Sequence, residues 1–99
     1  MLLTKENKTT INKLCEIHNV DTLYLFGSAT GTSFSKNSDI DFLVKFRQID
    51  LEKYFENYLA LKEKLKKLLK RDVDLVEKQT LRNPILINSI NKNKELIYG

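Results

Sequence analysis

The sequence predicts an α/β fold in which short strands alternate with amphipathic helices. Apolar runs of strand length occur at residues 23–26, 42–44 and 73–76. Longer segments, 9–18 and 51–70, repeat apolar residues at helical spacing. A chain of 99 residues can bury one hydrophobic core and little more, so we expect residues 1–99 to form a single domain.

The composition excludes several classes of protein. No apolar run reaches the roughly 20 residues of a membrane span, and the N-terminal segment has no signal-peptide core. Cys15 is the only cysteine, which excludes a disulfide framework and a cysteine-based zinc site and favours a reduced, cytoplasmic location. The net charge of +4 comes largely from residues 62–71, whose basic side chains are more typical of a solvated helix face than of a nucleic-acid surface.

The first predicted helix covers about Thr9 to His18, and Asn19 is a suitable residue to end it. Its apolar positions follow i, i+3, i+4, i+7 spacing and are Ile11, Leu14, Cys15 and His18. His18 is the only histidine. We expect it at the edge of the packed helix face and not in a catalytic role.

The next two elements are strands joined by a polar loop. Leu23–Phe26 is apolar on both faces, which indicates an interior strand that ends at Gly27. Residues 28–38 are rich in hydroxyl groups, and Phe34 is expected to anchor this loop on the core. From residue 39 to 46 polar and apolar side chains then alternate with the period of two that is typical of a strand.

The second half of the chain again alternates predicted helices and strands. Asp50 is a suitable N-cap for a helix that continues to about Lys70, with an aromatic and aliphatic stripe that would face the core or a partner. A strand at 73–76 follows, and Asn83-Pro84 opens another helix because proline is tolerated in the first turn. The last apolar residues, 96–98, are either a short edge strand or a packed tail.

Three aspartates are candidate metal ligands. Asp39 and Asp41 project from the same face of a strand, about 6–7 Å apart at Cα. Asp74 interrupts an apolar strand, where a carboxylate is costly unless it is paired or binds a metal. We prefer it to Asp72, which lies next to Arg71 at the start of that strand. The three carboxylates are expected to converge on one point, and an all-oxygen ligand set suits Mg²⁺ or Mn²⁺, not Zn²⁺.

Gly27 and Ser28 are candidate phosphate-binding residues. Gly27 allows close backbone approach, and the Ser28 hydroxyl with nearby N–H groups can donate to phosphate oxygens. Gly-Ser, ten residues, then Asp-Ile-Asp, with a third aspartate in a later strand, resembles the minimal nucleotidyltransferases of the DNA polymerase beta-like superfamily. The resemblance covers essentially the whole chain.

The resemblance implies a mixed sheet flanked by helices. It also implies Mg²⁺ at Asp39, Asp41 and Asp74 and ATP over Gly27 and Ser28. The usual partner of such proteins is a toxic HEPN-domain ribonuclease, which the nucleotidyltransferase neutralises by transferring AMP to a tyrosine. We therefore expect an Mg²⁺-dependent AMP transferase that acts as an antitoxin in a hetero-oligomer with its toxin.

One departure from the family pattern leaves alternatives open. Many members carry arginine shortly after Gly-Ser, where this sequence has residues 29–31, Ala-Thr-Gly. Lys36, Lys45 or Arg47 are the candidates to compensate for the missing charge. A second interpretation is an antitoxin that occludes its toxin without chemistry, and a third is a nucleic-acid-binding regulator that uses residues 62–71. The nucleotide base, the acceptor and the oligomeric state are not readable from the sequence.

Overall fold

The computed structural model describes residues 3–27 and 39–99. It confirms the predicted α/β class, with a four-stranded mixed sheet in the order β3-β2-β1-β4. β2 and β3 are parallel, whereas β1 pairs antiparallel with both β2 and β4. The elements in chain order are α1 Lys5–Ile17, β1 Val20–Phe26, β2 Ile40–Phe46, α2 Leu51–Leu69, β3 Val73–Glu77, the 3₁₀ turn η2 Lys78–Thr80, α3 Pro84–Asn93 and β4 Glu95–Tyr98.

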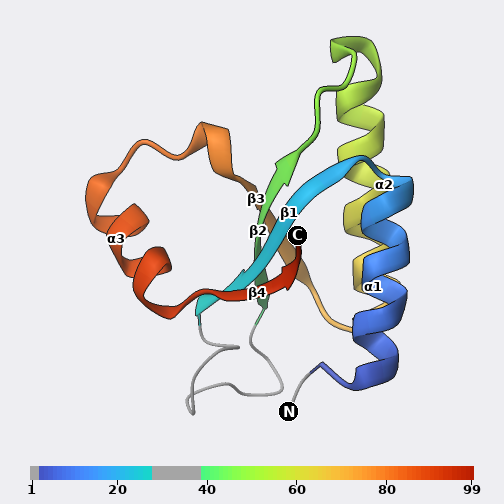
Figure 1. Ribbon diagram of the computed structural model, residues 1–99, viewed down its shortest axis with the longest axis horizontal. Helices are drawn as coiled ribbons and strands as arrows, with labels where there is room; N and C mark the ends of the chain where they lie inside the picture. The colour runs from blue at the N-terminus through green and yellow to red at the C-terminus, as the bar shows by residue number, and fades with distance from the viewer. Residues whose placement is uncertain (1–2, 28–38) are drawn as a thin grey trace.

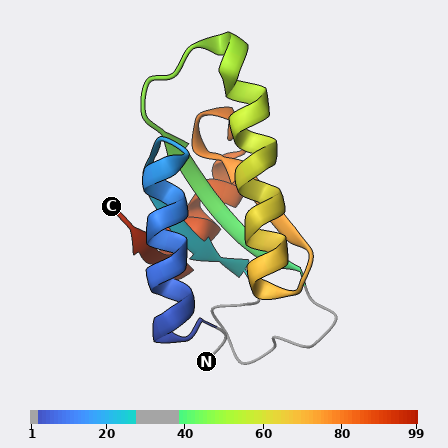
Figure 2. The ribbon, with the colours of Figure 1, turned by 90° about the vertical axis from the view of Figure 1, so that its right-hand side faces the viewer.

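The sheet separates two unequal helical layers. α1 and α2 lie side by side on one face, and α3 lies on the other (Figures 1 and 2). The core forms between the sheet and the α1–α2 layer, because alternate residues of each strand point to that side. Its fully buried members include Ile11 and Cys15 from α1, Leu61 and Leu65 from α2, and Leu23, Ile40, Phe42, Val44 and Leu75 from the strands.

α1 begins four residues before the predicted start. Thr4 is its N-cap, and the Thr4 hydroxyl accepts a hydrogen bond from the Asn7 N–H at 3.1 Å. The helix ends where predicted, with Asn19 in the left-handed region at φ 60°. His18 is more deeply buried than expected, with 5% of its surface exposed. Its Nδ1–H donates to the Leu14 carbonyl at 2.7 Å. The side chain therefore satisfies a backbone carbonyl in the last turn of α1.

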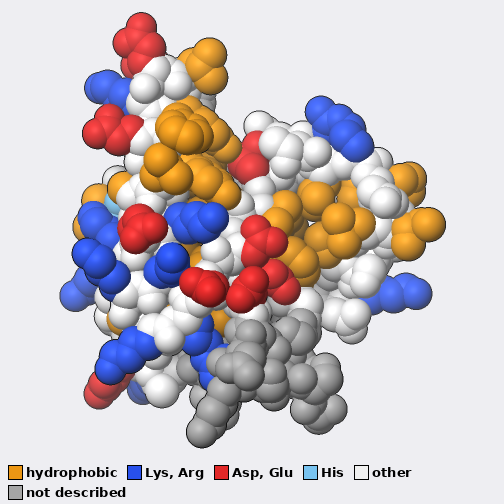
Figure 3. Space-filling view, turned by 180° about the vertical axis from the view of Figure 1, so that it is seen from behind, with side chains coloured by type: hydrophobic (Ala, Val, Ile, Leu, Met, Phe, Trp, Pro, Cys, Tyr) orange, Lys and Arg blue, Asp and Glu red, His pale blue; other side chains and the backbone are white. Residues whose placement is uncertain are grey.

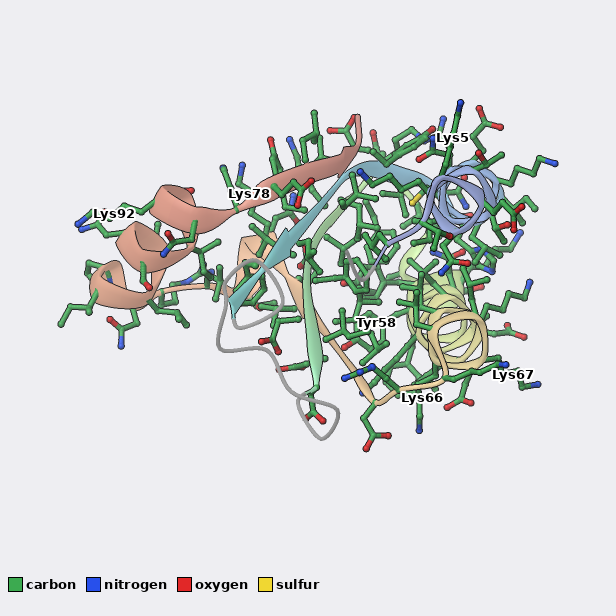
Figure 4. All side chains as sticks on the ribbon, turned by 90° about the horizontal axis from the view of Figure 1, so that it is seen from below. Lys5, Tyr58, Lys66, Lys67, Lys78 and Lys92 are labelled. Atoms are coloured by element: carbon green, nitrogen blue, oxygen red, sulfur yellow. The ribbon has the colours of Figure 1, made fainter. Side chains whose placement is uncertain are left out.

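α2 begins directly after Asp50, as predicted, but the Asp50 side chain makes no capping hydrogen bond. The Asp50 carbonyl instead accepts from the N–H groups of Lys53 and Tyr54. The predicted stripe divides in two: Tyr54 is half-buried, whereas Leu51 and Phe55 are 87% and 67% exposed. The basic residues of 62–71 are exposed or half-exposed, and Figure 4 shows Lys66 and Lys67 on the outer side of α2.

α3 begins at Pro84, and the Asn83 side chain caps it by accepting from the Ile85 N–H at 2.9 Å. Of its predicted apolar side only Ile90 is buried, and Ile85 is 80% exposed. The C-terminal residues form the edge strand β4 and not a packed tail. No helix within residues 3–27 and 39–99 is long and apolar enough to cross a membrane.

Candidate active site

Asp41 and Asp74 lie side by side on neighbouring strands. They are register partners in the parallel pair of β2 and β3, so their Cα atoms are about 4.8 Å apart and their side chains share one face of the sheet. This is the face opposite the α1–α2 layer, because the flanking residues Ile40, Phe42 and Leu75 point into the core. The sheet register therefore brings together two aspartates that are far apart in the sequence.

The charges of this pair interact. The pKa of the half-buried Asp41 carboxyl is raised above its usual value, first by burial and then by the negative charges of Asp74 and Asp39. Figure 3, which shows the molecule from behind, has acidic side chains gathered near its centre, below a group of apolar side chains. A carboxyl whose pKa is raised by neighbouring negative charge is favoured in its charged form when a cation offsets that charge. The pair is therefore suited to binding a cation.

Asp39 is less closely associated with the acidic pair than Asp41 and Asp74 are with each other. It precedes the first residue of β2 and is exposed, and its effect on the Asp41 pKa is the smallest of the three causes. Within residues 3–27 and 39–99, no three acidic, histidine or cysteine side chains form a group that could hold a metal ion alone. Convergence of the Asp39 carboxylate with those of Asp41 and Asp74 stays a prediction. Asp72 belongs to a different environment, because its Oδ1 is 3.6 Å from Lys66 Nζ on the surface.

Gly27 lies next to Asp41 at the end of β1, the strand on the other side of β2 from β3. It follows Phe26, which is the register partner of Asp41, and its φ of +76° lies in the left-handed region. A Cβ at this position would be 2.4 Å from Asp41 Oδ2. Only glycine therefore allows the end of β1 and the Asp41 carboxylate to approach so closely. Ser28, the second predicted phosphate-binding residue, lies outside the described residues, as do Phe34 and Lys36.

Two of the cations considered as substitutes for the loop arginines lie elsewhere. Lys45 shares the Asp41 face but is four residues further along β2, about 13 Å away at Cα, and its Nζ is 3.7 Å from Asp21 Oδ2. Arg47 follows β2, and its Nη2 donates to the Glu16 carbonyl at 3.2 Å. Both side chains therefore act at the far end of the strand.

Tyr58 is a neighbour of the site that the sequence did not reveal. Its hydroxyl donates to the Leu75 carbonyl, and its pKa is raised by burial and then by the charge of Asp74. Figure 4 shows Tyr58 between α2 and the sheet. Its helical spacing indicated a packed residue, but the hydrogen bond depends on the docking of α2 against β3.

Comparison with known proteins gives a consistent result. Residues 9–99 match the family of polymerase beta nucleotidyltransferases. Two proteins of Methanocaldococcus jannaschii, both described as protein adenylyltransferases, are 37% and 38% identical to this chain. The alignments cover 82% and 86% of this chain and 78% and 82% of those proteins, respectively.

Solved structures share the fold. One described as a minimal nucleotidyltransferase superposes with a TM-score of 0.76 at 25% identity, covering 92% of this chain and 89% of that one. A toxin–antitoxin complex with AMP-PNP gives 0.70 at 28% identity, over 97% and 74% of the two chains. A complex of a tri-AMPylated HEPN toxin of Shewanella oneidensis with its MNT antitoxin gives 0.67 at 25% identity, over 100% and 73%. On this evidence the chain belongs, with the minimal nucleotidyltransferases, to the polymerase beta nucleotidyltransferase family and is a nucleotidyltransferase.

Proposed function

We propose that the protein transfers AMP from ATP to a tyrosine hydroxyl of a HEPN-domain toxin in the cytoplasm and acts as the antitoxin of that toxin. The observation that carries this proposal is the register pairing of Asp41 with Asp74, against which Gly27 lies. The adenylyltransferase relatives and the AMPylated-toxin complex support the choice of nucleotide and partner. The protein and its toxin would then form a hetero-oligomer.

The ligand chemistry of the site fits Mg²⁺. Mg²⁺ usually takes one or two protein carboxylates and completes its octahedral shell with water and substrate phosphates. Asp41 and Asp74 provide such a pair, with Asp39 as the additional ligand. Because the described residues contain no complete three-residue group, the triphosphate itself would complete the shell. When bound, the ion supplies charge stabilisation at the phosphate oxygens.

The residues of this chain then have separate tasks. Gly27 lets the triphosphate approach the backbone, and Ser28 donates to its terminal phosphates. Asp74 lies on the edge strand β3. In this proposal it orients the acceptor hydroxyl and receives its proton. The acceptor oxygen forms a bond to the α-phosphorus as the bond from that phosphorus to the β-phosphate oxygen breaks, and pyrophosphate leaves.

A second candidate function is neutralisation by occlusion. It is favoured by the positions of Lys45 and Arg47, which do not supply the phosphate-binding charge that the loop lacks. In that case the fold and the acidic pair would serve only to present a surface to the toxin.

Intact-mass spectrometry of the toxin after incubation with ATP and Mg²⁺ separates these functions. Wild type should add one AMP or a small multiple, and Asp41→Asn and Asp74→Asn should each abolish the addition. Asp72→Asn is the matched control, because Asp72 belongs to a surface ion pair, and it should transfer AMP at the wild-type rate. Full neutralisation by the Asp41→Asn/Asp74→Asn double variant would refute the enzymatic function and favour occlusion.

A further inference from the structure

A groove lies between α2 and β3 at the free edge of the sheet, and its volume is about 320 Å³. It is lined by three aromatic residues of α2, Tyr54, Phe55 and Tyr58, and by Val76 and Glu77 of β3. No lysine or arginine of the described part of the chain lines it. The groove is therefore aromatic and carries negative charge.

Two walls of the groove are held in place by contacts within the protein. The Tyr54 ring lies edge-on to the Phe46 ring with 5.5 Å between their centroids, and the Tyr54 hydroxyl is hydrogen-bonded to the Glu77 side chain. Tyr58, which lies between α2 and the sheet (Figure 4), is fixed by its hydrogen bond to a β3 carbonyl. Phe55, by contrast, is 67% exposed. Two fixed walls and one exposed ring form a preorganised site for a side chain of another molecule.

The edge of β3 at this groove is not open to an added strand. The Asp72 carbonyl accepts from the N–H of the first β2 residue, so the alternation of the backbone turns the carbonyls of Leu75 and Glu77 towards the free edge. The Tyr58 hydroxyl already donates to the Leu75 carbonyl. The Thr80 hydroxyl donates to the Glu77 carbonyl at 2.7 Å. A partner therefore binds here through its side chains and not through its backbone.

The groove lies on the side of Asp41 opposite Gly27. The strand order places Gly27, Asp41 and Asp74 in a row across β1, β2 and β3. If pyrophosphate leaves on the Gly27 side, an in-line displacement requires the acceptor oxygen to enter across Asp74 and the free edge of β3. Val76 is two residues beyond Asp74, and the pKa of Tyr58 is raised by burial and then by the charge of Asp74. The groove therefore borders the path of the acceptor.

We propose that this groove binds a basic side chain of the toxin, close to the tyrosine that receives AMP. The aromatic rings attract a cation, and Glu77 supplies the opposite charge. Arginine suits the groove best, because a guanidinium can stack on a ring and bond a carboxylate at the same time. This inference rests on the proposed function, because it takes the acceptor to be a protein.

Opposite charges introduced at Phe55 test the charge of the occupant. The KM for the toxin is measured from AMP transfer at saturating ATP, and thermal denaturation checks the fold, which an exposed position should not disturb. Phe55→Lys should raise this KM by about tenfold or more, whereas Phe55→Glu should change it by no more than about threefold. ATP affinity, measured by calorimetry, should be unchanged in both. Leu51→Lys and Leu51→Glu are the matched controls, because Leu51 is 87% exposed on the same helix and does not line the groove, and their KM values should be equal.

Other results contradict the inference. An equal rise in KM for Phe55→Lys and Phe55→Glu would mean that the occupant is apolar. A wild-type KM in both variants would place the toxin elsewhere and leave the proposed function intact. Self-association of wild type that Phe55→Lys abolishes would assign the groove to a second copy of this chain. Absence of AMP transfer by wild type would refute the proposed function and this inference with it.

A double-mutant cycle identifies the bound residue. Each arginine and lysine of the toxin is replaced with alanine and combined with Glu77→Gln, which removes the charge but keeps a side-chain acceptor for the Gln79 N–H. One basic residue should lose most of its effect on KM in the Glu77→Gln background, because residues in contact are not additive. Glu52→Gln, an exposed glutamate of α2 outside the groove lining, is the control and should be additive with every toxin variant. Additivity of Glu77→Gln with all of them would refute the proposed contact.

Discussion

Replacing Gly27 with alanine tests whether the close approach of β1 to Asp41 is required for activity. The added Cβ would lie 2.4 Å from Asp41 Oδ2, whereas ordinary contacts begin near 3.4 Å. The carboxylate must therefore move by about 1 Å, and a misplacement of that size in a catalytic group can lower the rate about 100-fold. We expect AMP transfer to fall by about that factor.

The same substitution should destabilise the fold by a smaller, calculable amount. Alanine at a φ of +76° costs about 1–2 kcal/mol, and turning Asp41 away from its rotamer costs about 0.5–1.5 kcal/mol. Loss of glycine's freedom in the unfolded chain offsets about 0.4–1 kcal/mol. The net loss of about 2 kcal/mol corresponds to a melting temperature about 10 °C lower for a domain of this size.

The assay combines thermal denaturation with the transfer rate, measured well below both melting temperatures. Gly99→Ala is the control: Gly99 also has a positive φ, but its Cβ would meet Thr22 and not a carboxylate. It should leave the transfer rate unchanged. A Gly27→Ala protein that is folded and transfers AMP at the wild-type rate would refute the role assigned to this contact.

Three further predictions concern single groups. Because its pKa is raised in the folded state, the Asp41 carboxyl contributes stability below about pH 4 that is lost as the pH rises through its folded-state pKa. Asp41→Asn should therefore raise the melting temperature at pH 7 in chelator, whereas Mg²⁺ should stabilise only wild type. Mg²⁺ stabilisation of the variant would place the ion elsewhere. Tyr58→Phe removes the donor to the Leu75 carbonyl and should cost about 1 kcal/mol in denaturant unfolding, and no loss would mean that water replaces the hydroxyl. Lys70→Gly should stabilise by about 1 kcal/mol in the same assay because Lys70 has φ 56°, and a loss would show that its side chain packs at the helix end.

Local patterns predicted the strands well, because side-chain alternation is a property of the chain itself. The period of two predicted that Asp41 and the buried Phe42 point to opposite faces of the sheet, and the structure has that arrangement. The early start of α1 was missed because its first turn, from Lys5, is polar and has no apolar periodicity. The N-cap at Asp50 was correctly located, but the absence of a side-chain hydrogen bond depends on a rotamer that no pattern encodes.

The sequence predicted which residues could form the candidate site, but it predicted only part of how they are arranged in space. The sequence contains Asp41 and Asp74, but their adjacency depends on the register of two strands that residues 47–72 separate. The contact of Gly27 with Asp41 and the Tyr58 hydrogen bond both arise from packing between distant segments. Such features follow from tertiary structure, which residue spacing does not specify.

The parallel pairing of β2 with β3 has a consequence for how the protein becomes active during folding. Parallel strands cannot form a hairpin, so the chain must order α2 and close a long loop before Asp74 reaches Asp41. Contacts of this kind slow folding, because the entropy of loop closure must be overcome before they form. Chains in which β3 has not yet paired with β2 therefore lack the acidic pair, and newly made protein gains it only when β3 docks.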